Sequence, residues 1–245
     1  MFIIYLFSGK LIRSFTFMIN NFTFTKKDNV FNKELSKKVL DRFDQIFREN
    51  KYTRINSNII KLQENDILKE HLLSDLFSKV KKQFELIVDK SDLIFIQLWL
   101  VSSKSNNENK NILPYIPHID KDRRLKAMVY LHDIDLEHGP IHLGKLKKTI
   151  DIEQRRKKLP KDFQKKGLNT IDDEHLENDL IPIIGKTGDV VFFDTNTPHK
   201  AGTVKDNYCR KVLRFDFQRP QYSPRIFKLK HSIIFILSYL KKICK

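Results

Sequence analysis

The chain has 245 residues, of which 40% are hydrophobic and 31% are charged. This length and composition are typical of one soluble domain with a buried core, and they exclude a disordered chain. The formal charge is +16, from 46 basic and 30 acidic residues. Such an excess favours an anionic partner: nucleic acid, a phosphorylated or CoA-linked substrate, or an acidic membrane surface.

Cysteine content and hydropathy bear on where the protein works. Cys209 and Cys244 are too few and too far apart for a disulfide scaffold or a cysteine-based metal site, which favours a reducing, cytoplasmic location. No stretch reaches the roughly 18 to 20 uninterrupted apolar residues of a membrane-spanning helix. The apolar N-terminal segment is interrupted by Lys10 and Arg13 and lacks a small-residue cleavage site. We therefore expect a first strand or a start-site extension there, and no signal peptide.

The first half of the chain predicts two amphipathic helices. Apolar residues recur at helical spacing between residues 32 and 49, and again from Asp66, the expected N-cap, to Val88. The inward positions are Leu35, Val39, Leu40, Phe43, Ile46 and Phe47, then Leu72, Leu73, Leu76, Val80 and Phe84. We expect both stripes to pack on the core and assign them no chemical role.

From residue 93 the pattern changes to short, β-rich runs separated by turn residues, which is typical of a β-sandwich or small barrel. In chain order these runs are LIFIQLWLVS, PYIPHID, KAMVYLHDI, GPIHL, LIPII, GDVVFFDTN, HKAGTV and CRKVLRFDF. A highly charged interval at about 145–180 interrupts them and predicts a helical insertion. The sequence therefore predicts one α+β domain over residues 1–245, with an antiparallel β core at about 93–218 and helices outside it.

The tail predicts a last amphipathic helix at about 223–243, with an apolar face flanked by lysines. Such a helix can cover an edge of its own domain, pair with another subunit, or lie in a membrane interface. Packing on the domain is the commoner outcome. Residues 223–245 also leave open a peripheral contact at the inner face of the membrane.

Two histidines and an aspartate form a candidate metal site. His118 and Asp120 are two residues apart in a strand-like segment, so an imidazole and a carboxylate share one face. His199 follows the run GDVVFFDTN, on a strand end that could fold back toward them. Two histidines and one carboxylate suit iron(II) with open coordination positions, although zinc accepts the same ligands. For His118 and Asp120 alone, the alternative is a chance pair in which the aspartate accepts a turn hydrogen bond.

Arginine supplies the next feature, because Arg210 follows His199 by eleven residues. In an alternating strand its guanidinium points inward beside the triad, and its planar fork of donors suits one end of a dicarboxylate. Arg214 lies on the same face by period two and is the second candidate. Three further histidines near a Gly-Pro turn are expected to be exposed or satisfied in the core, not metal ligands: His132, His138 and His142.

Four segments resemble, in order and spacing, motifs of the phytanoyl-CoA dioxygenase-like family of iron(II)/2-oxoglutarate-dependent oxygenases: PHID, VYLHDIDLEHGPIHL, GDVVFFDTNTPHKAG and CRKVLRFDF. The resemblance spans about half of the chain and implies a double-stranded β-helix, or jelly roll, with flanking N-terminal helices. It implies that His118, Asp120 and His199 bind iron(II), that Arg210 binds 2-oxoglutarate, and that Gln97 lies near the cosubstrate. The chain departs from the family where GPIHLGKLKKTID replaces a Pro-Gly-Ser-His segment, which concerns the loop beside the substrate.

The resemblance further implies a dioxygenase that uses 2-oxoglutarate and O2 as cosubstrates. Relatives that halogenate lack the carboxylate at Asp120, so its presence favours hydroxylation. The basic residues of the insertion favour an anionic substrate, either a small molecule, an acyl-CoA, or a molecule linked to a lipid or glycan. A solvated helix face is an equally good interpretation of these residues.

Three other functions stay open at this stage. An oxygenase acting on nucleic acid fits the positive charge, but stacking aromatics interleaved with basic residues are not evident. A non-catalytic metal-binding jelly-roll module would not be expected to keep His118, Asp120, His199 and Arg210 together. A zinc hydrolase explains the triad but leaves the arginine without a task. The sequence does not indicate an oligomeric state.

Overall fold

The computed structural model describes residues 23–49, 51–88, 93–105, 114–120, 123–144 and 180–219. In chain order their elements are β1 Phe24–Lys27, α2 Lys33–Arg48, β2 Thr53–Asn56, β3 Ile59–Leu62, α3 Glu64–Leu68, α4 His71–Val88, β4 Ile94–Lys104, β5 Leu125–Tyr130, β6 Ile141–Gly144, β7 Leu180–Pro182, β8 Val190–Asp194, β9 His199–Ala201 and β10 Cys209–Gln218. The N-terminal segment, nearly all of the predicted insertion and the predicted C-terminal helix lie outside the described residues.

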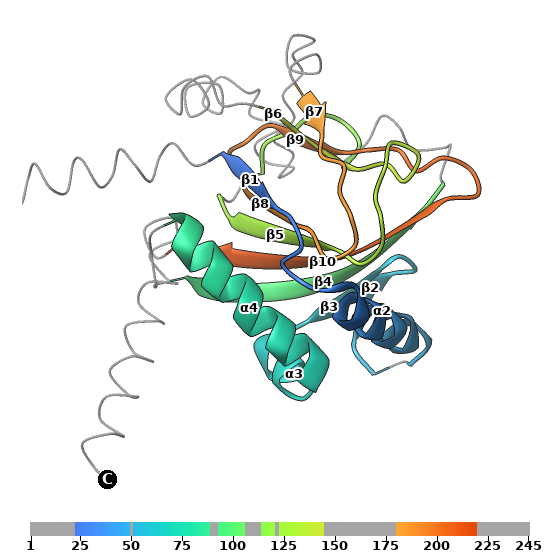
Figure 1. Ribbon diagram of the computed structural model, residues 1–245, viewed down its shortest axis with the longest axis vertical. Coiled ribbons are helices and arrows are strands. Elements are labelled where there is room, and N and C mark those ends of the chain that lie inside the picture. The colour runs from blue at the N-terminus through green and yellow to red at the C-terminus, as the bar shows by residue number, and fades with distance from the viewer. Residues whose placement is uncertain are drawn as a thin grey trace, which may run out of the picture.

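The larger sheet is antiparallel, with the order β1-β8-β5-β10-β4-β3-β2. Alternate residues of its central strands face opposite sides, as the pleat requires. The outer face is apolar and buried, and α4 lies against it (Figure 1). Buried side chains of this layer include Leu125, Ala127 and Val129 of β5, Leu213 and Phe215 of β10, and Leu76, Val80 and Phe84 of α4. These residues form the main hydrophobic core.

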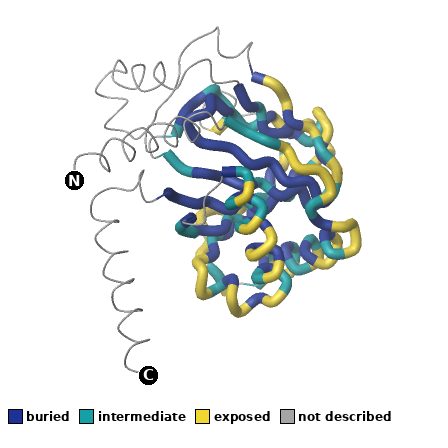
Figure 2. Tube along the Cα trace, turned by 60° about the vertical axis from the view of Figure 1, so that its left-hand side comes forward, coloured by how far each residue is buried: buried dark blue, intermediate teal, exposed yellow. Residues whose placement is uncertain are grey.

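The smaller sheet has the order β7-β6-β9 and lies on the other side of the larger sheet from α4 (Figure 1). A second apolar cluster includes residues of both sheets: Tyr130, Ile134, Ile141, Leu143, Ile183, Val191, Phe193 and Val212. Burial follows this layering, since the buried residues run through the strands while exposed ones gather on the outer helices and turns (Figure 2). Two antiparallel sheets with helices outside them are the α+β architecture predicted from the sequence.

The first predicted helix is confirmed as α2, which begins after the N-cap Asn32 and buries Val39, Phe43 and Ile46. The second prediction was wrong in one respect, because α3 and α4 stand where one helix was expected. Asp66 lies inside α3, where its carboxylate accepts a hydrogen bond from the backbone N–H of Gln63 at 2.9 Å. The break falls at Lys69 and Glu70. At this break the Glu70 carboxylate accepts a hydrogen bond from Arg42 Nη2 of α2 at 2.7 Å.

Every predicted β run except one contains a strand. PYIPHID forms a single bridge, through His118, and no regular strand. The sequence pattern missed three short strands: β1, and the β2–β3 hairpin that extends the larger sheet beyond β4. Among the described helices, none is long and apolar enough to cross a bilayer.

Candidate active site

The fold brings His118 and His199 side by side. Each backbone N–H donates to the other residue's carbonyl at 2.9 Å, which makes an antiparallel bridge at the edge of the smaller sheet. The segment runs on alongside β9, where the Ala201 N–H donates to the Pro114 carbonyl at 2.8 Å. The two imidazole ring centroids are 4.3 Å apart. These backbone hydrogen bonds hold two residues that are 81 positions apart in the chain in a fixed relative position.

Backbone contacts also fix which nitrogen each imidazole presents. The Nδ1 of His118 is 2.8 Å from the carbonyl of Ile116, and the Nδ1 of His199 is 2.8 Å from the carbonyl of Thr197. A carbonyl only accepts, so each Nδ1 donates its N–H to the backbone and each Nε2 is directed at the cluster. Burial, together with the neighbouring His199, lowers the pKa of His118 to about 3. His118 therefore presents a neutral Nε2, the form that binds a metal ion.

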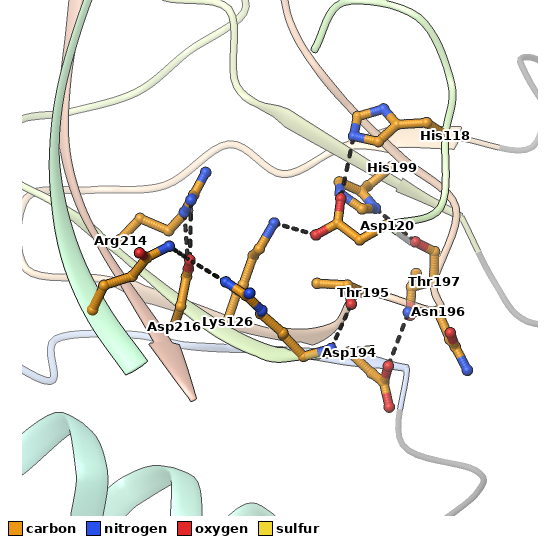
Figure 3. A network of polar contacts seen from close by, with 12 residues as sticks. His118, Asp120, Lys126, Asp194, Thr195, Asn196, Thr197, His199, Arg214 and Asp216 are labelled. Carbon is orange, nitrogen blue, oxygen red and sulfur yellow. Dashed lines mark hydrogen bonds and ion pairs between the residues drawn. The ribbon is translucent and has the colours of Figure 1, made fainter. Parts of the chain in front are cut away.

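Asp120 completes the cluster through one of its two carboxylate oxygens. Oδ1 is 3.7 Å from Nε2 of His118 and 3.5 Å from Nε2 of His199. Oδ2 accepts a hydrogen bond from Lys126 Nζ at 2.5 Å (Figure 3). Burial opposes ionisation of this carboxyl, but Lys126 and His199 hold its pKa well below its usual range. The carboxylate is thus ionised, with one oxygen toward the imidazoles and the other toward an ammonium.

The donor set fits a single divalent ion. The ligand atoms of His118, Asp120 and His199 lie within 4.8 Å of one another, and among the described residues no other group of three such side chains does so. Two neutral imidazoles and one carboxylate are the ligands of non-haem iron(II), and they leave coordination positions open. In the absence of any thiolate, the set also accepts other divalent metals.

The turn after β8 is hydrogen-bonded to the segment that carries Asp120, which fixes Asp120 relative to His199. The Asp120 N–H donates to the Thr195 carbonyl at 3.2 Å, and the Thr195 hydroxyl accepts from the Arg124 N–H at 2.7 Å. Asp194 is 1% exposed, and its carboxylate accepts a hydrogen bond from the Asn196 N–H at 2.9 Å, which stabilises the turn (Figure 3). Thr197, whose carbonyl orients the His199 ring, belongs to the same turn. These contacts explain how a short segment without regular structure presents its ligands rigidly.

Arg210 lies in the same cavity as both histidines, on β10. The guanidinium is buried and donates to the Gly139 and Gly202 carbonyls and, at 3.2 Å, to the Ser103 hydroxyl. Its Nε has no hydrogen-bond partner, and no carboxylate of the described residues pairs with it. A buried cation without a counter-ion is costly, so an anion bound beside Arg210 would be stabilised there.

Glycine is required where the loops around Arg210 meet. Gly139 has φ +63°, and a Cβ there would lie 2.5 Å from the Gly202 carbonyl oxygen. A Cβ on Gly202 would lie 2.4 Å from the Pro140 carbonyl oxygen. Both carbonyls that receive the guanidinium therefore belong to a contact that only glycine permits.

Two cavities adjoin at the cluster. The first, of about 420 Å³, is lined by Arg210, Ser103, Tyr115, Lys200 and both histidines, among others. The second, of about 340 Å³, is lined by Gln97, Asp120, Arg124 and Asp216, among others. The predicted cosubstrate residues divide between them: Arg210 lines the first, Gln97 the second, and Arg214 both.

Gln97 and Arg214 share a partner that the sequence reading did not single out. Gln97 donates to the Asp216 carboxylate at 2.8 Å, and Arg214 donates to it through Nε and Nη2 at 2.9 and 3.1 Å. Lys126 was missed as well. The only sequence signal for either was a charged residue inside a β-rich run; Asp216 also lies two residues from Arg214, on the same face of its strand.

The other three histidines have local partners. The His132 Nε2 accepts from the Lys211 backbone N–H at 3.0 Å, and the His138 Nδ1 is 2.7 Å from the Asp135 carboxylate. The His142 Nδ1 is 3.0 Å from the Pro140 carbonyl. In the part of the chain that the structure describes, none of them belongs to the cluster of His118, Asp120 and His199.

Comparisons with known proteins agree with this site. A model of the phytanoyl-CoA dioxygenase family matches residues 104–212, a range that contains His118, Asp120, His199 and Arg210 but not Gln97 or Arg214. No curated protein sequence matches the chain.

Several solved structures share the fold. The epimerase SnoN of nogalamycin biosynthesis, solved with Fe3+ and α-ketoglutarate, is 15% identical and has a TM-score of 0.62, covering 88% of this chain and 87% of its own. EvdO2 from Micromonospora carbonacea var. aurantiaca, complexed with 2-oxoglutarate, is 16% identical, with a TM-score of 0.56 and coverage of 80% and 86%. A Pseudomonas putida prolyl-4-hydroxylase is 12% identical, with a TM-score of 0.52 and coverage of 84% and 98%.

At these identities the neighbours establish the fold alone, and that fold is the predicted jelly roll. The match over residues 104–212 and the shared fold confirm the resemblance drawn from the sequence motifs, which is to the phytanoyl-CoA dioxygenase-like family of iron(II)/2-oxoglutarate-dependent oxygenases.

Proposed function

We propose that this chain is an iron(II)- and 2-oxoglutarate-dependent dioxygenase that hydroxylates an anionic substrate. The observation that carries the proposal is the convergence of two kinds of group on one cavity. His118, Asp120 and His199 offer three ligand atoms to one metal ion. Arg210 is buried, no carboxylate of the described residues pairs with it, and it lines the same cavity as both histidines, where its guanidinium can bind the distal carboxylate of 2-oxoglutarate.

The residues of the chain bind, orient and exclude water, while the metal and cosubstrate supply the redox chemistry. Iron(II) held by His118, Asp120 and His199 would supply, with 2-oxoglutarate, the oxidation of a substrate C–H bond to C–OH by O2. One oxygen atom of O2 would enter the substrate and the other succinate, with release of carbon dioxide from 2-oxoglutarate. Lys126 keeps one oxygen of Asp120 engaged, which leaves the other to the metal.

The zinc hydrolase remains a weaker candidate because it gives Arg210 no task. A non-catalytic metal-binding module would produce no succinate. An oxygenase acting on nucleic acid would show binding that weakens steeply with salt concentration. Among the neighbours, SnoN is called an epimerase, so product analysis must separate hydroxylation from other oxidative outcomes.

The first test is an anaerobic titration of iron(II)-loaded protein with 2-oxoglutarate, following the weak visible charge-transfer band of the chelate. We expect a band that requires both components and that needs a much higher 2-oxoglutarate concentration in Arg210→Ala. Arg48→Ala is the matched control, because this exposed arginine at the end of α2 lies outside both cavities. Absence of any band in iron-replete wild type would overturn the 2-oxoglutarate assignment.

A further inference from the structure

The second cavity holds no group that the proposed function has used for the cosubstrate. If 2-oxoglutarate extends from the metal cluster to Arg210, it lies in the first cavity. The two cavities share the wall residues Trp99, Pro114, His118, Lys126 and Arg214, so a ligand in the second would lie directly beside the metal. What that cavity binds can therefore be asked separately, although the inference rests on the proposed function.

Polar side chains from three adjacent strands line this cavity. Lys126 on β5 is the register partner of Asp216 on β10, and Asp216 is the register partner of Gln97 on β4. In the next row on the same face, Arg214 is the partner of Trp99, and its guanidinium carbon lies 3.9 Å from the centroid of the indole ring. Figure 3 shows Lys126 and Arg214 extending from neighbouring strands toward the side on which Asp120 lies.

The charges of this cavity do not cancel once the metal site is filled. Its lining contains three cations, Arg124, Lys126 and Arg214, and two carboxylates, Asp120 and Asp216. Asp216 is 1% exposed and is already engaged by Arg214 and Gln97. A divalent ion beside Asp120 adds further positive charge. A partly enclosed cavity with a positive balance attracts an anion and strengthens its hydrogen bonds.

Two of the cations keep unused donors. Lys126 Nζ carries three N–H groups, and its one hydrogen-bond partner among the described residues is Asp120. Its side chain is 9% exposed, so solvent reaches little of it. Arg214 commits Nε and Nη2 to Asp216, while its Nη1 has no partner in the described part of the chain. Stacking on Trp99 holds that guanidinium in place.

We propose that the second cavity binds a carboxylate or phosphate group of the substrate, held by Lys126 and Arg214. Since Lys126 also contacts Asp120, the bound anion lies next to the metal. The C–H bond that reacts is therefore only a few covalent bonds away from the anionic group of the substrate. The substrate class is therefore a small organic acid or phosphate ester, or a longer molecule whose acidic end enters first. A substrate with its charge far from the reacting carbon would leave these donors unpaired.

Calorimetric titration of the anaerobic protein loaded with iron(II) and 2-oxoglutarate tests this assignment. The probes are inorganic phosphate, butyrate, and butyramide as the uncharged analogue of butyrate. We expect phosphate or butyrate to bind and butyramide not to bind, and the anion that binds identifies the type of oxyanion. Lys126→Gln should weaken anion binding about tenfold or more, and Lys126→Arg should restore part of it.

Two further variants keep the test specific. Lys205→Gln removes the same charge from an exposed residue that pairs with Glu137 and lies outside both cavities, so it should bind the probe like wild type. Arg214→Lys keeps the charge but removes the Nη1 donor, so it should weaken binding of the probe. This variant provides the test if Lys126→Gln does not fold. Thermal unfolding of each variant checks its fold.

The outcomes separate this inference from the proposed function. A probe affinity that falls in Lys126→Gln by a larger factor than the 2-oxoglutarate affinity does supports the subsite. A loss of 2-oxoglutarate affinity as large as that of the probe assigns Lys126 to the cosubstrate and overturns it. A wild-type complex that shows the 2-oxoglutarate band but binds neither anion overturns the subsite alone. Absence of the band removes the proposed function, and the subsite with it.

Discussion

Replacing Arg210 by methionine should change ligand binding strongly and folding stability little. An ordinary truncation of a large buried side chain costs about 2–5 kcal/mol. At this position two terms oppose each other. The variant loses donors to the Gly139 and Gly202 carbonyls, but it also removes a buried cation that pairs with no carboxylate of the described residues. We expect the free energy of unfolding without 2-oxoglutarate to change by about 1 kcal/mol or less.

The effect on 2-oxoglutarate is larger. At a concentration of 100 times Kd, ligand binding stabilises the wild-type protein by about 2.7 kcal/mol. In a chain of this size that raises Tm by about 5–11 °C. Loss of a paired, charge-assisted contact of about 3 kcal/mol weakens binding on the order of 100-fold. At the same concentration the stabilisation then falls to about 0.4 kcal/mol, or about 1–2 °C in Tm.

Differential scanning fluorimetry with and without 2-oxoglutarate measures both quantities on manganese-loaded protein, which avoids oxidation of iron. Arg48→Met serves as the control and should keep the full ligand-induced shift. A full shift in Arg210→Met would contradict a role for Arg210 in 2-oxoglutarate binding. A variant that melts many degrees lower without ligand would contradict the expected stability, because Arg210 would then be a structural residue whose burial needs no bound anion.

Three further predictions concern the metal, the glycine contact and the helical layer. Chelation by EDTA should abolish the 2-oxoglutarate-induced shift in Tm, and excess Mn2+ should restore it; a shift that survives chelation would separate the anion site from the cluster of His118, Asp120 and His199. Gly139→Ala, which puts a Cβ 2.5 Å from the Gly202 carbonyl at a φ of +63°, should weaken 2-oxoglutarate binding along with stability, and unchanged calorimetric affinity would contradict this. Glu70→Gln should destabilise the fold by about 2–3 kcal/mol at pH 7, measured by urea unfolding. Hydrogen bonding from Arg42 lowers the pKa of Glu70 to about 2. The stabilisation is therefore fully present above the usual carboxyl pKa and is lost as the pH falls through about 2. The difference in unfolding free energy between wild type and variant should shrink in acid, and a constant difference would argue against the ion pair.

The sequence predicted those parts of the fold whose information is local. The helical stripe that contains Val39, Phe43 and Ile46 has a period that specifies both the helix and its buried face. The β runs from residue 93 onward were found for the same reason. Asp66 was misplaced because the break between α3 and α4 coincides with a contact between Glu70 and Arg42, 28 residues apart, which no local window contains.

The candidate site was only partly accessible for a similar reason. His118 and His199 could be paired by motif order, but the two backbone hydrogen bonds between them depend on strand pairing. Lys126 could not be connected to Asp120 from the sequence, since its strand faces inward only because of its register with β8 and β10. Gln97 was expected beside the cosubstrate. Its hydrogen bond to Asp216 and its place in the second cavity now favour the substrate side.

The two faces of the larger sheet differ in a way that packing of a structural core does not explain. Its outer face follows the expected rule, with buried apolar residues on each central strand. Its inner face breaks that rule on three neighbouring strands at once, with Gln97 on β4, Lys126 on β5 and the set Arg210, Arg214 and Asp216 on β10. Buried charge of this kind stabilises a fold poorly compared with apolar packing. Sequences tolerate such local conflicts mainly where function requires them. The two cavities lie where the conflicts are concentrated, and the metal cluster lies where the cavities adjoin.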